Sequence, residues 1–206
     1  MKQKWIALAV LGAMLVQVAP ISSMTAAALE TTAISDITAT DAVLLKYNKH
    51  DTYVEITGFR ADETDIVLPD TIDGLPVTTI QEGAFFSSQL TSIPESVTQI
   101  GGIAFQACAD LQRIEVDEHN PAYTSVDGVL YDKEEKILYA YPNALAENEN
   151  TLKSSYSVPD GVETIAQGEF FYNQSLTNLT LPHSIQVLEA DAFSDTALRD
   201  IYYDGT

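Results

Sequence analysis

The chain has 206 residues and a formal net charge of −20, with 30 Asp and Glu residues against 10 Lys and Arg. This acidic balance argues against binding to nucleic acids or to anionic membrane surfaces, because both need a basic protein face. Cys108 is the single cysteine, which excludes an internal disulfide. We expect it to be a small buried side chain rather than a reactive thiol.

Residues 1–28 have the features of a secretory signal peptide. Two early lysines supply a positive start, an apolar run extends from Trp5 to Ala19, and the alanines at 26–28 offer a cleavage site. The apolar run is shorter than the ~20 residues that a transmembrane helix needs. We therefore predict an exported protein, secreted or at the cell surface, with no membrane insertion after cleavage. An uncleaved anchor is the alternative.

Residues 29–41 follow as a flexible lead-in rich in Ala, Thr and Ser, and residues 42–59 predict a β-hairpin. Two strand-like runs there flank residues 48–51, whose sequence Asn-Lys-His-Asp is good turn chemistry. The terminal unit of a repeat array needs covering, because it has no neighbour on one side. We expect this hairpin to cap the first repeat.

The segment 90–105 is one copy of a unit that recurs along the chain. A proline is followed by residues at offsets 3, 6, 10 and 11, which are apolar apart from one glutamate, and a fourth copy keeps the spacing without its proline: Pro94, Val97, Ile100, Ala104, Phe105; Pro182, Ile185, Leu188, Ala192, Phe193; Pro159, Val162, Ile165, Glu169, Phe170; and Val77, Ile80, Ala84, Phe85. This spacing does not suit a helix. A unit this short buries its apolar face only by stacking on its neighbours, and its length is that of leucine-rich repeats.

The repeats therefore predict a mainly β solenoid spanning residues 42–206, with repeats at 66–116 and 156–206. In each unit, one short strand precedes the proline, a second side follows it, and the phenylalanine plugs the core. A β-sandwich with accidental internal similarity is the alternative. Glu169 stands where the other copies have alanine, so we expect that repeat to be distorted or shifted by one residue.

The best copies, Leu90–Cys108 and Leu176–Phe193, resemble the BspA-like leucine-rich repeats of bacterial surface and secreted proteins. The segment Asn120–Tyr131 also resembles one found between such repeats, and the likeness covers about residues 53–206. The resemblance implies a right-handed leucine-rich-repeat solenoid with protein-binding or adhesive roles. It implies no shared catalytic residues. We also expect no cofactor.

Residues 117–155 interrupt the repeats. Two strand-like runs, 129–131 and 137–139, flank a polar tip and predict a β-hairpin insertion that buds from the edge of the solenoid. The run 198–206 has the form of the opening strand of another repeat. Because an uncapped strand edge is a pairing site, we expect that the native chain continues or that this edge pairs with another chain.

No sequence motif indicates catalysis or a metal site. His50, His119 and His183 lie far apart and lack metal-ligand spacing. Residues 117–120, Asp-Glu-His-Asn, come nearest to a ligand cluster, but adjacent side chains point in different directions, so we interpret them as a solvated turn, with a weak calcium site as the alternative. We predict that the chain is not an enzyme and has no catalytic or metal-binding residues; a hydrolase is the alternative.

The candidate binding residues flank the inward-facing positions of the repeat strands. Successive strand side chains alternate in direction, so these should point outward as a polar stripe: Arg113, Glu115, Asn178, Thr180, Asp200 and Tyr202. Solenoids commonly bind through such faces. The predicted function is a non-catalytic exported module for protein–protein interaction or adhesion, at the bacterial cell surface or in an extracellular assembly.

A glycan is the second candidate partner. Its motive is a set of tyrosines in or near the insertion and the last strand, although most of these are expected to be half-buried strand residues: Tyr123, Tyr131, Tyr139, Tyr141, Tyr202 and Tyr203. The alternatives are therefore a carbohydrate-binding module, or an accessory domain of a larger extracellular enzyme.

Overall fold

The computed structural model describes residues 44–60, 66–88, 90–148 and 151–204, which belong to one compact unit. Throughout these residues the chain forms strands joined by turns, without a helix. Accordingly, none of them lies in a helix long and apolar enough to cross a membrane. The predicted signal peptide and the lead-in, residues 1–41, lie outside the described residues.

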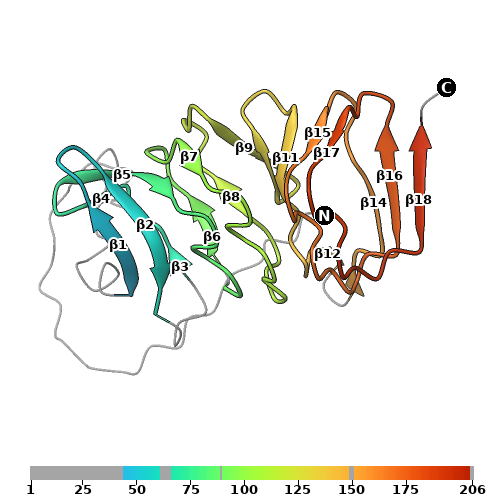
Figure 1. The fold of residues 1–206 in the computed structure, drawn as a ribbon, viewed down its shortest axis with the longest axis horizontal. Coiled ribbons are helices and arrows are strands. Elements are labelled where there is room, and N and C mark those ends of the chain that lie inside the picture. Colours follow the sequence, from blue (N-terminus) through green and yellow to red (C-terminus); the bar gives the residue numbers. More distant parts are fainter. Residues whose placement is uncertain (1–43, 61–65, 89, 149–150, 205–206) are drawn as a thin grey trace, which may run out of the picture. The chain divides into compact units, whose positions relative to one another are not determined.

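Two three-stranded parallel sheets carry the strands that open the repeats (Figure 1). We call them the first and second repeat sheets. The first repeat sheet contains β3 (Ile66–Val67), β6 (Leu90–Ile93) and β8 (Glu115–Val116). The second contains β14 (Ser155–Ser157), β16 (Asn178–Pro182) and β18 (Asp200–Asp204).

The second side of each coil contributes to two further sheets. One includes β5 (Leu75–Ile80) paired in parallel with β7 (Gln99–Ile100), and the other includes β15 (Thr164–Ile165) paired in parallel with β17 (Val187–Leu188). Each complete repeat thus supplies one strand to a repeat sheet and one to a flanking sheet. Successive coils stack, which confirms the predicted β solenoid.

A hairpin precedes the first repeat, as predicted. Its strands β1 (Leu45–Lys49) and β2 (Val54–Phe59) pair antiparallel, and β2 then pairs in parallel with β5. A smaller strand, β4 (Thr71–Ile72), turns back onto β5 through Asp73 and Gly74. Val54 and Ile56 on β2 are fully buried, so the hairpin covers the apolar end of the first coil as a cap.

The phenylalanines of the repeats stack on aromatic rings of neighbouring coils or of the capping hairpin. The ring centroids of Phe59 and Phe85 lie 6.2 Å apart, and those of Phe85 and Phe105 also 6.2 Å. In the second half, the Phe170 ring lies 5.0 Å from Tyr141 and 5.6 Å from Phe193. Each fully buried ring contributes roughly 1.5–3 kcal/mol through its removal from water. Phe85, Phe105 and Phe170 are buried and confirm the predicted core plugs, whereas Phe193 is half-buried.

The turn around each phenylalanine has one backbone shape in all four copies. Two residues per turn are left-handed, at φ between 53° and 72°: Gly83 and Ser87, Ile103 and Ala107, Gly168 and Tyr172, Asp191 and Asp195. The backbone N–H of Phe170 donates to Ala192 O, just as that of Phe85 donates to Ala104 O. Glu169 therefore occupies the alanine position with its turn in register, and the expected distortion or shift was wrong.

The insertion joins the solenoid instead of budding from it. Strands β9 (Tyr123–Val126), β10 (Val129–Asp132) and β11 (Ile137–Ala140) form an antiparallel meander, and β11 pairs in parallel with β15 of the next repeat. The predicted hairpin is confirmed, but its predicted position at the edge was wrong. The reason is that all three side chains of 129–131 are apolar and buried, which a hairpin exposed on one face would not allow.

Strands β10 and β11 separate the core into two clusters. Leu130 and Ala140 pack into the first cluster, with the capping hairpin and the first repeats. Val129, Tyr131 and Leu138 pack into the second, with the later repeats. In β10, where neighbouring strand residues point to opposite faces, Leu130 packs into one cluster and Val129 and Tyr131 into the other. The pairing of β10 with β11 is irregular between Leu130 and Tyr131, and together the two strands are a divider with buried residues in both clusters.

Candidate functional site

The structure places four of the six predicted binding residues together on the second repeat sheet. Asn178 lies opposite Asp200, and Thr180 opposite Tyr202, in the parallel register of β16 and β18. The Asn178 side-chain amide donates a hydrogen bond to the Asp200 carboxylate, with an N–O distance of 3.3 Å. Tyr202 is 57% exposed. These four side chains form an outward polar patch.

Two serines extend this patch and were missed by the sequence analysis. Ser155 and Ser157 on β14 are exposed and lie opposite Asn178 and Thr180. The signal was available, since the sequence restarts the repeat around Tyr156–Pro159 in the same frame as Leu179–Pro182. The second repeat sheet thus presents two rows: Ser155, Asn178, Asp200; and Ser157, Thr180, Tyr202.

The other two predicted residues lie on the first repeat sheet. Glu115 on β8 pairs in register with Ser92 on β6, and Arg113 just before β8 forms an ion pair with Glu115. Both side chains are more than half exposed, at 62% for Arg113 and 52% for Glu115. The predicted stripe is therefore divided between two sheets.

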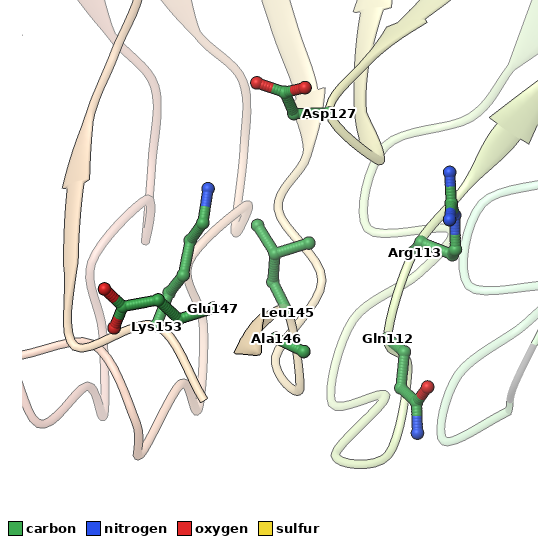
Figure 2. A pocket seen from close by; sticks show the side chains of 7 residues that line it. All are labelled: Gln112, Arg113, Asp127, Leu145, Ala146, Glu147 and Lys153. Carbon is green, nitrogen blue, oxygen red and sulfur yellow. The ribbon is translucent and has the colours of Figure 1, made fainter. Parts of the chain in front are cut away.

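A hollow of about 480 Å³ opens next to Arg113 (Figure 2). Two backbone segments flank the hollow, and they are joined at one end, where the Ala144 N–H donates to Leu111 O at 2.9 Å. They then diverge: one continues into β8, and the other turns into an exposed hairpin of β12 (Ala146–Asn148) and β13 (Thr151–Leu152). The residues that line the hollow are Gln112, Arg113, Asp127, Leu145, Ala146, Glu147 and Lys153.

The hollow carries charges of both signs. Arg113 and Lys153 supply the cations, and Asp127 and Glu147 the carboxylates. Lys153 lies with its Nζ 5.9 Å from the centroid of the Tyr156 ring and forms no ion pair with any described residue. No cation of this set is paired with a carboxylate of the set. No sequence motif indicates this site, because its residues come from four separate segments.

Half of the six tyrosines that motivated a glycan site are core residues, and a fourth, Tyr139, is half-buried against the core. Tyr123, Tyr131 and Tyr141 are at most 6% exposed. Burial raises the pKa of Tyr123 and Tyr131 to about 12 each, since the phenolate form would be desolvated. By contrast, Tyr202 and Tyr203 are 57% and 59% exposed. Only the last strand therefore offers tyrosine rings of this set as a contact surface.

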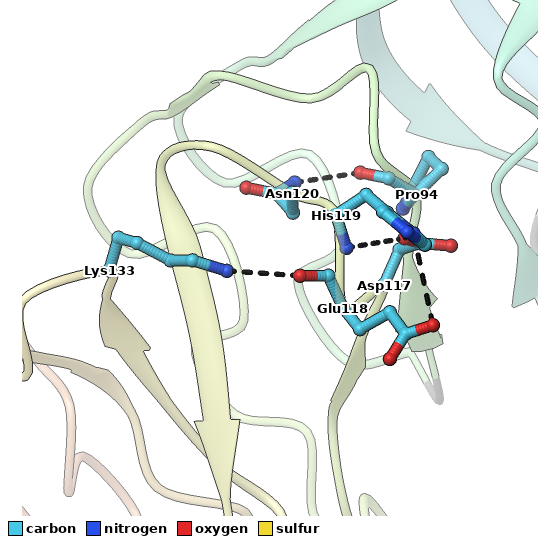
Figure 3. A network of polar contacts seen from close by, with 6 residues as sticks. All are labelled: Pro94, Asp117, Glu118, His119, Asn120 and Lys133. Carbon is cyan, nitrogen blue, oxygen red and sulfur yellow. Dashed lines mark hydrogen bonds and ion pairs between the residues drawn. The ribbon is translucent and has the colours of Figure 1, made fainter.

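The acidic turn at 117–120 has a structural role (Figure 3). Asn120 is fully buried, and its side-chain amide donates to Pro94 O at 2.7 Å and Val97 O at 2.9 Å. Its side-chain oxygen accepts hydrogen bonds from the backbone N–H groups of Ala122 and Tyr123. Every hydrogen-bonding position of this amide is used, and it ties the start of the insertion to the preceding repeat.

The other residues of that turn are exposed. The Asp117 carboxylate accepts the backbone N–H of His119 at 2.8 Å, and the Lys133 ammonium donates to Glu118 O at 3.2 Å. Across the described part of the chain, no three His, Cys, Asp or Glu side chains are grouped so that they could hold a metal ion.

Cys108 fills a repeat corner. It is 2% exposed, and its thiol donates to Phe85 O at 3.1 Å. Burial raises the pKa of this thiol, which disfavours the reactive thiolate. Asn173 takes the same position two repeats later and accepts the backbone N–H of Leu176 at 2.8 Å. The expected small buried side chain is confirmed, and Cys108 and Asn173 each form a hydrogen bond with a backbone group at their corner.

A family model of the BspA type leucine rich repeat region matches residues 62–127 and 141–206, in six copies. The chain belongs to the BspA-type leucine-rich-repeat family. The unmatched stretch between these segments contains the strands β10 and β11 that divide the core. Among curated proteins, none is significantly similar in sequence to this chain.

Solved structures of bacterial leucine-rich-repeat proteins share this fold. A leucine rich cell surface protein from Faecalibacterium prausnitzii is 30% identical over 68% of this chain and 35% of its own, with a TM-score of 0.56. The pneumococcal vaccine antigen PcpA is 28% identical over 64% of this chain and 32% of its own, with a TM-score of 0.54. This BspA-type chain thus spans about a third of the length of either structure.

A leucine-rich repeat protein from Eubacterium ventriosum shares the fold at 22% identity and a TM-score of 0.51, covering 61% of this chain and 41% of its own. At this level of identity, the likeness bears on the fold alone.

Proposed function

We propose that this chain is a non-catalytic, exported BspA-type module that binds a protein partner through the outward side chains of its repeat sheets, at the bacterial cell surface or in an extracellular assembly. The observation that carries this proposal is the pair of in-register rows on the second repeat sheet. The names of two similar structures, a cell surface protein and a vaccine antigen, support the location.

The rows suit binding because their backbone is fixed from below. Leu179 and Leu181 alternate with the outward residues of β16 and are at most 5% exposed. Their burial holds Asn178 and Thr180 in place, so little backbone entropy is lost when a partner docks. An aromatic side chain, Tyr202, lies at one end of a row, and tyrosine is among the residues that most often dominate interface energies.

Capture of extracellular bacterial proteins on the immobilised chain tests this proposal. Thr180→Arg places a bulky cation in the middle of the outward patch, and we expect it to weaken partner binding at least ~10-fold, a typical loss at an interface centre. Gln186→Arg is the matched control, since Gln186 is exposed just before β17. Equal capture by the native protein and both variants would contradict binding through this patch.

Carbohydrate binding is the second candidate function. Tyr202 offers an exposed ring beside the hydrogen-bonded Asn178 and Asp200 pair, a combination of stacking and polar groups that suits a sugar. A glycan array probed with the native protein and with Tyr202→Ala separates the two functions. Glycan signals that disappear in the variant would favour carbohydrate binding over protein binding.

A further inference from the structure

The hollow beside Arg113 is continuous with the proposed binding surface. Arg113 lines the hollow and also belongs to the predicted stripe, and Lys153 lies two residues before β14 of the second repeat sheet. A partner that spans both repeat sheets therefore crosses the hollow. Its volume of about 480 Å³ lies within the range of roughly 300–1,000 Å³ for ligand pockets.

The charged groups of the hollow are held apart by the backbone. Asp127 and Gly128 form a tight turn with φ of 52° and 84°, the pattern of a type I′ hairpin turn. A Cβ on Gly128 would lie 2.9 Å from Arg113 Cβ, so this turn packs directly against the arginine. Ile114 N–H also donates to Gly128 O at 2.9 Å. Asp127 is thus fixed near Arg113 and Lys153, yet forms an ion pair with neither.

The cations and the carboxylates that line the hollow both have hydrogen-bonding positions that a ligand could use. The guanidinium of Arg113 has five N–H donors, and among the described residues it forms an ion pair with Glu115. The Lys153 ammonium lies over the face of the Tyr156 ring and forms no ion pair within the described part of the chain. The Asp127 and Glu147 carboxylates form no ion pair with any described residue. A ligand with charge of one sign would be attracted either by the two cations or by the two carboxylates, and repelled by the others.

A ligand with one acidic and one basic group can interact favourably with both the cations and the carboxylates of the hollow. In an extended peptide, residues i and i+2 point to the same side and lie about 6.5–7 Å apart, which lets one segment present a carboxylate and an ammonium group together. The lining is mainly polar, with Leu145 and Ala146 as its apolar members, so a largely apolar ligand is a poor fit. The net charge of −20 also attracts the ammonium-bearing end over longer distances.

We propose that the hollow binds an extended segment of a protein partner that presents an acidic and a basic side chain two residues apart. The acidic side chain lies between Arg113 and Lys153, and the basic one contacts Asp127 and Glu147. The proposal rests on the proposed function, because it names the chemistry of a partner that docks on the repeat sheets.

Nuclear magnetic resonance titration with a capped peptide tests this inference. The probe is acetyl-Ala-Glu-Ala-Lys-Ala-amide, and the two controls replace its Glu or its Lys with Gln. We expect saturable shifts of the backbone amide signals of Arg113, Asp127 and Lys153, and a two- to fivefold weaker Kd for each control peptide, in keeping with one exposed ion pair. Added salt should weaken binding.

Protein variants supply the second arm. Lys153→Gln and Asp127→Asn should each weaken the probe two- to fivefold, Lys153→Arg should retain binding, and Lys133→Gln, whose ammonium donates to Glu118 O outside the hollow, should leave it unchanged. The inference is overturned if the probe causes no saturable shift at these amides, or if the control peptides bind equally well. Should that happen while Thr180→Arg still weakens partner capture at least ~10-fold, the proposed function stands and only the inference is lost.

Discussion

Glu169 shows how a single residue can depart from the repeat without disturbing the turn. It occupies a position that alanine fills in the other copies, and the residue is half-buried. Burial of its carboxyl raises the pKa well above the usual value of 4.5, and the Glu189 carboxylate of the next coil adds to this shift. The left-handed residues at 168 and 172 set the turn, so the side chain between them adapts while the backbone stays in register.

Replacing Glu169 by Gln should therefore change the pH dependence of stability. The folded protein keeps this proton to a higher pH than the unfolded chain, so the folded state binds more protons above pH ~4.5, and stability is lost as pH rises through the folded pKa. We expect Glu169→Gln to match the native protein at pH 4 and to be more stable at pH 7. Urea midpoints across this range measure the difference, and a difference independent of pH would contradict the assignment.

The burial of Asn120 could not be predicted from the residues around it. The sequence indicates a solvated turn at 117–120, and Asp117, Glu118 and His119 are indeed exposed. Asn120 itself is fully buried, because its amide can donate and accept at once and therefore satisfies backbone groups of two segments. Its partners Pro94 and Val97 are more than 20 residues away, so nothing local to the turn distinguishes it.

At the scale of the element, close stacking of the coils depends on one glycine. A Cβ on Gly101 would lie 2.3 Å from the backbone N of Glu82 in the preceding coil, whereas one on Gly102 would meet only the Gln167 side chain, at 3.7 Å. The Gly101 N–H also donates to Ile80 O at 2.8 Å. This glycine is needed for space, since two backbones approach each other there.

The adjacent glycines offer a matched test. We expect Gly101→Ala to cost about 1–3 kcal/mol or more of unfolding free energy, because the coils must move apart. Gly102→Ala should stay within about 0.5 kcal/mol, as is usual for substitutions away from such contacts. Chemical unfolding of both variants decides the matter, and equal costs would show that the two coils do not meet at Gly101.

The elements differ in how far the sequence predicts them. The repeat strands were predictable because residues at equal offsets, such as Val97 and Ile185, must occupy equivalent places in a stack. The position of β10 and β11 inside the solenoid was not predicted, although the unbroken apolar run 129–131 is a sign of a strand buried on both faces. The hollow could not be predicted from the sequence. It forms beside a hydrogen bond between Leu111 and Ala144, where two segments far apart in the sequence meet and then separate.

At the scale of the whole solenoid, the divider formed by β10 and β11 belongs to both core clusters. Leu130 contributes to one cluster and Leu138 to the other, and both are fully buried. Each cluster therefore uses this pair of strands as one of its walls. The molecule should depend on the insertion for stability, although the family model leaves residues 128–140 unmatched.

Replacing residues 129–140 by a Gly-Ser linker tests this dependence. We expect the variant to lose cooperative thermal unfolding in both halves, because two buried surfaces become exposed together. Leu130→Ala and Leu138→Ala should each cost about 2–5 kcal/mol, whereas Leu152→Ala, at a residue 45% exposed, serves as the control and should cost little. A linker variant that melts like the native protein would mean that the insertion is dispensable.

The divider also has a consequence for how such proteins diversify. A substitution deep in one cluster has no direct neighbour in the other, and the energetic effects of well-separated changes usually add. Each half can therefore accumulate changes over generations without compensation from its counterpart. Leu130 and Tyr131 are neighbours in the divider but pack into different clusters. Substitutions at these two positions must therefore remain compatible with the packing of both halves.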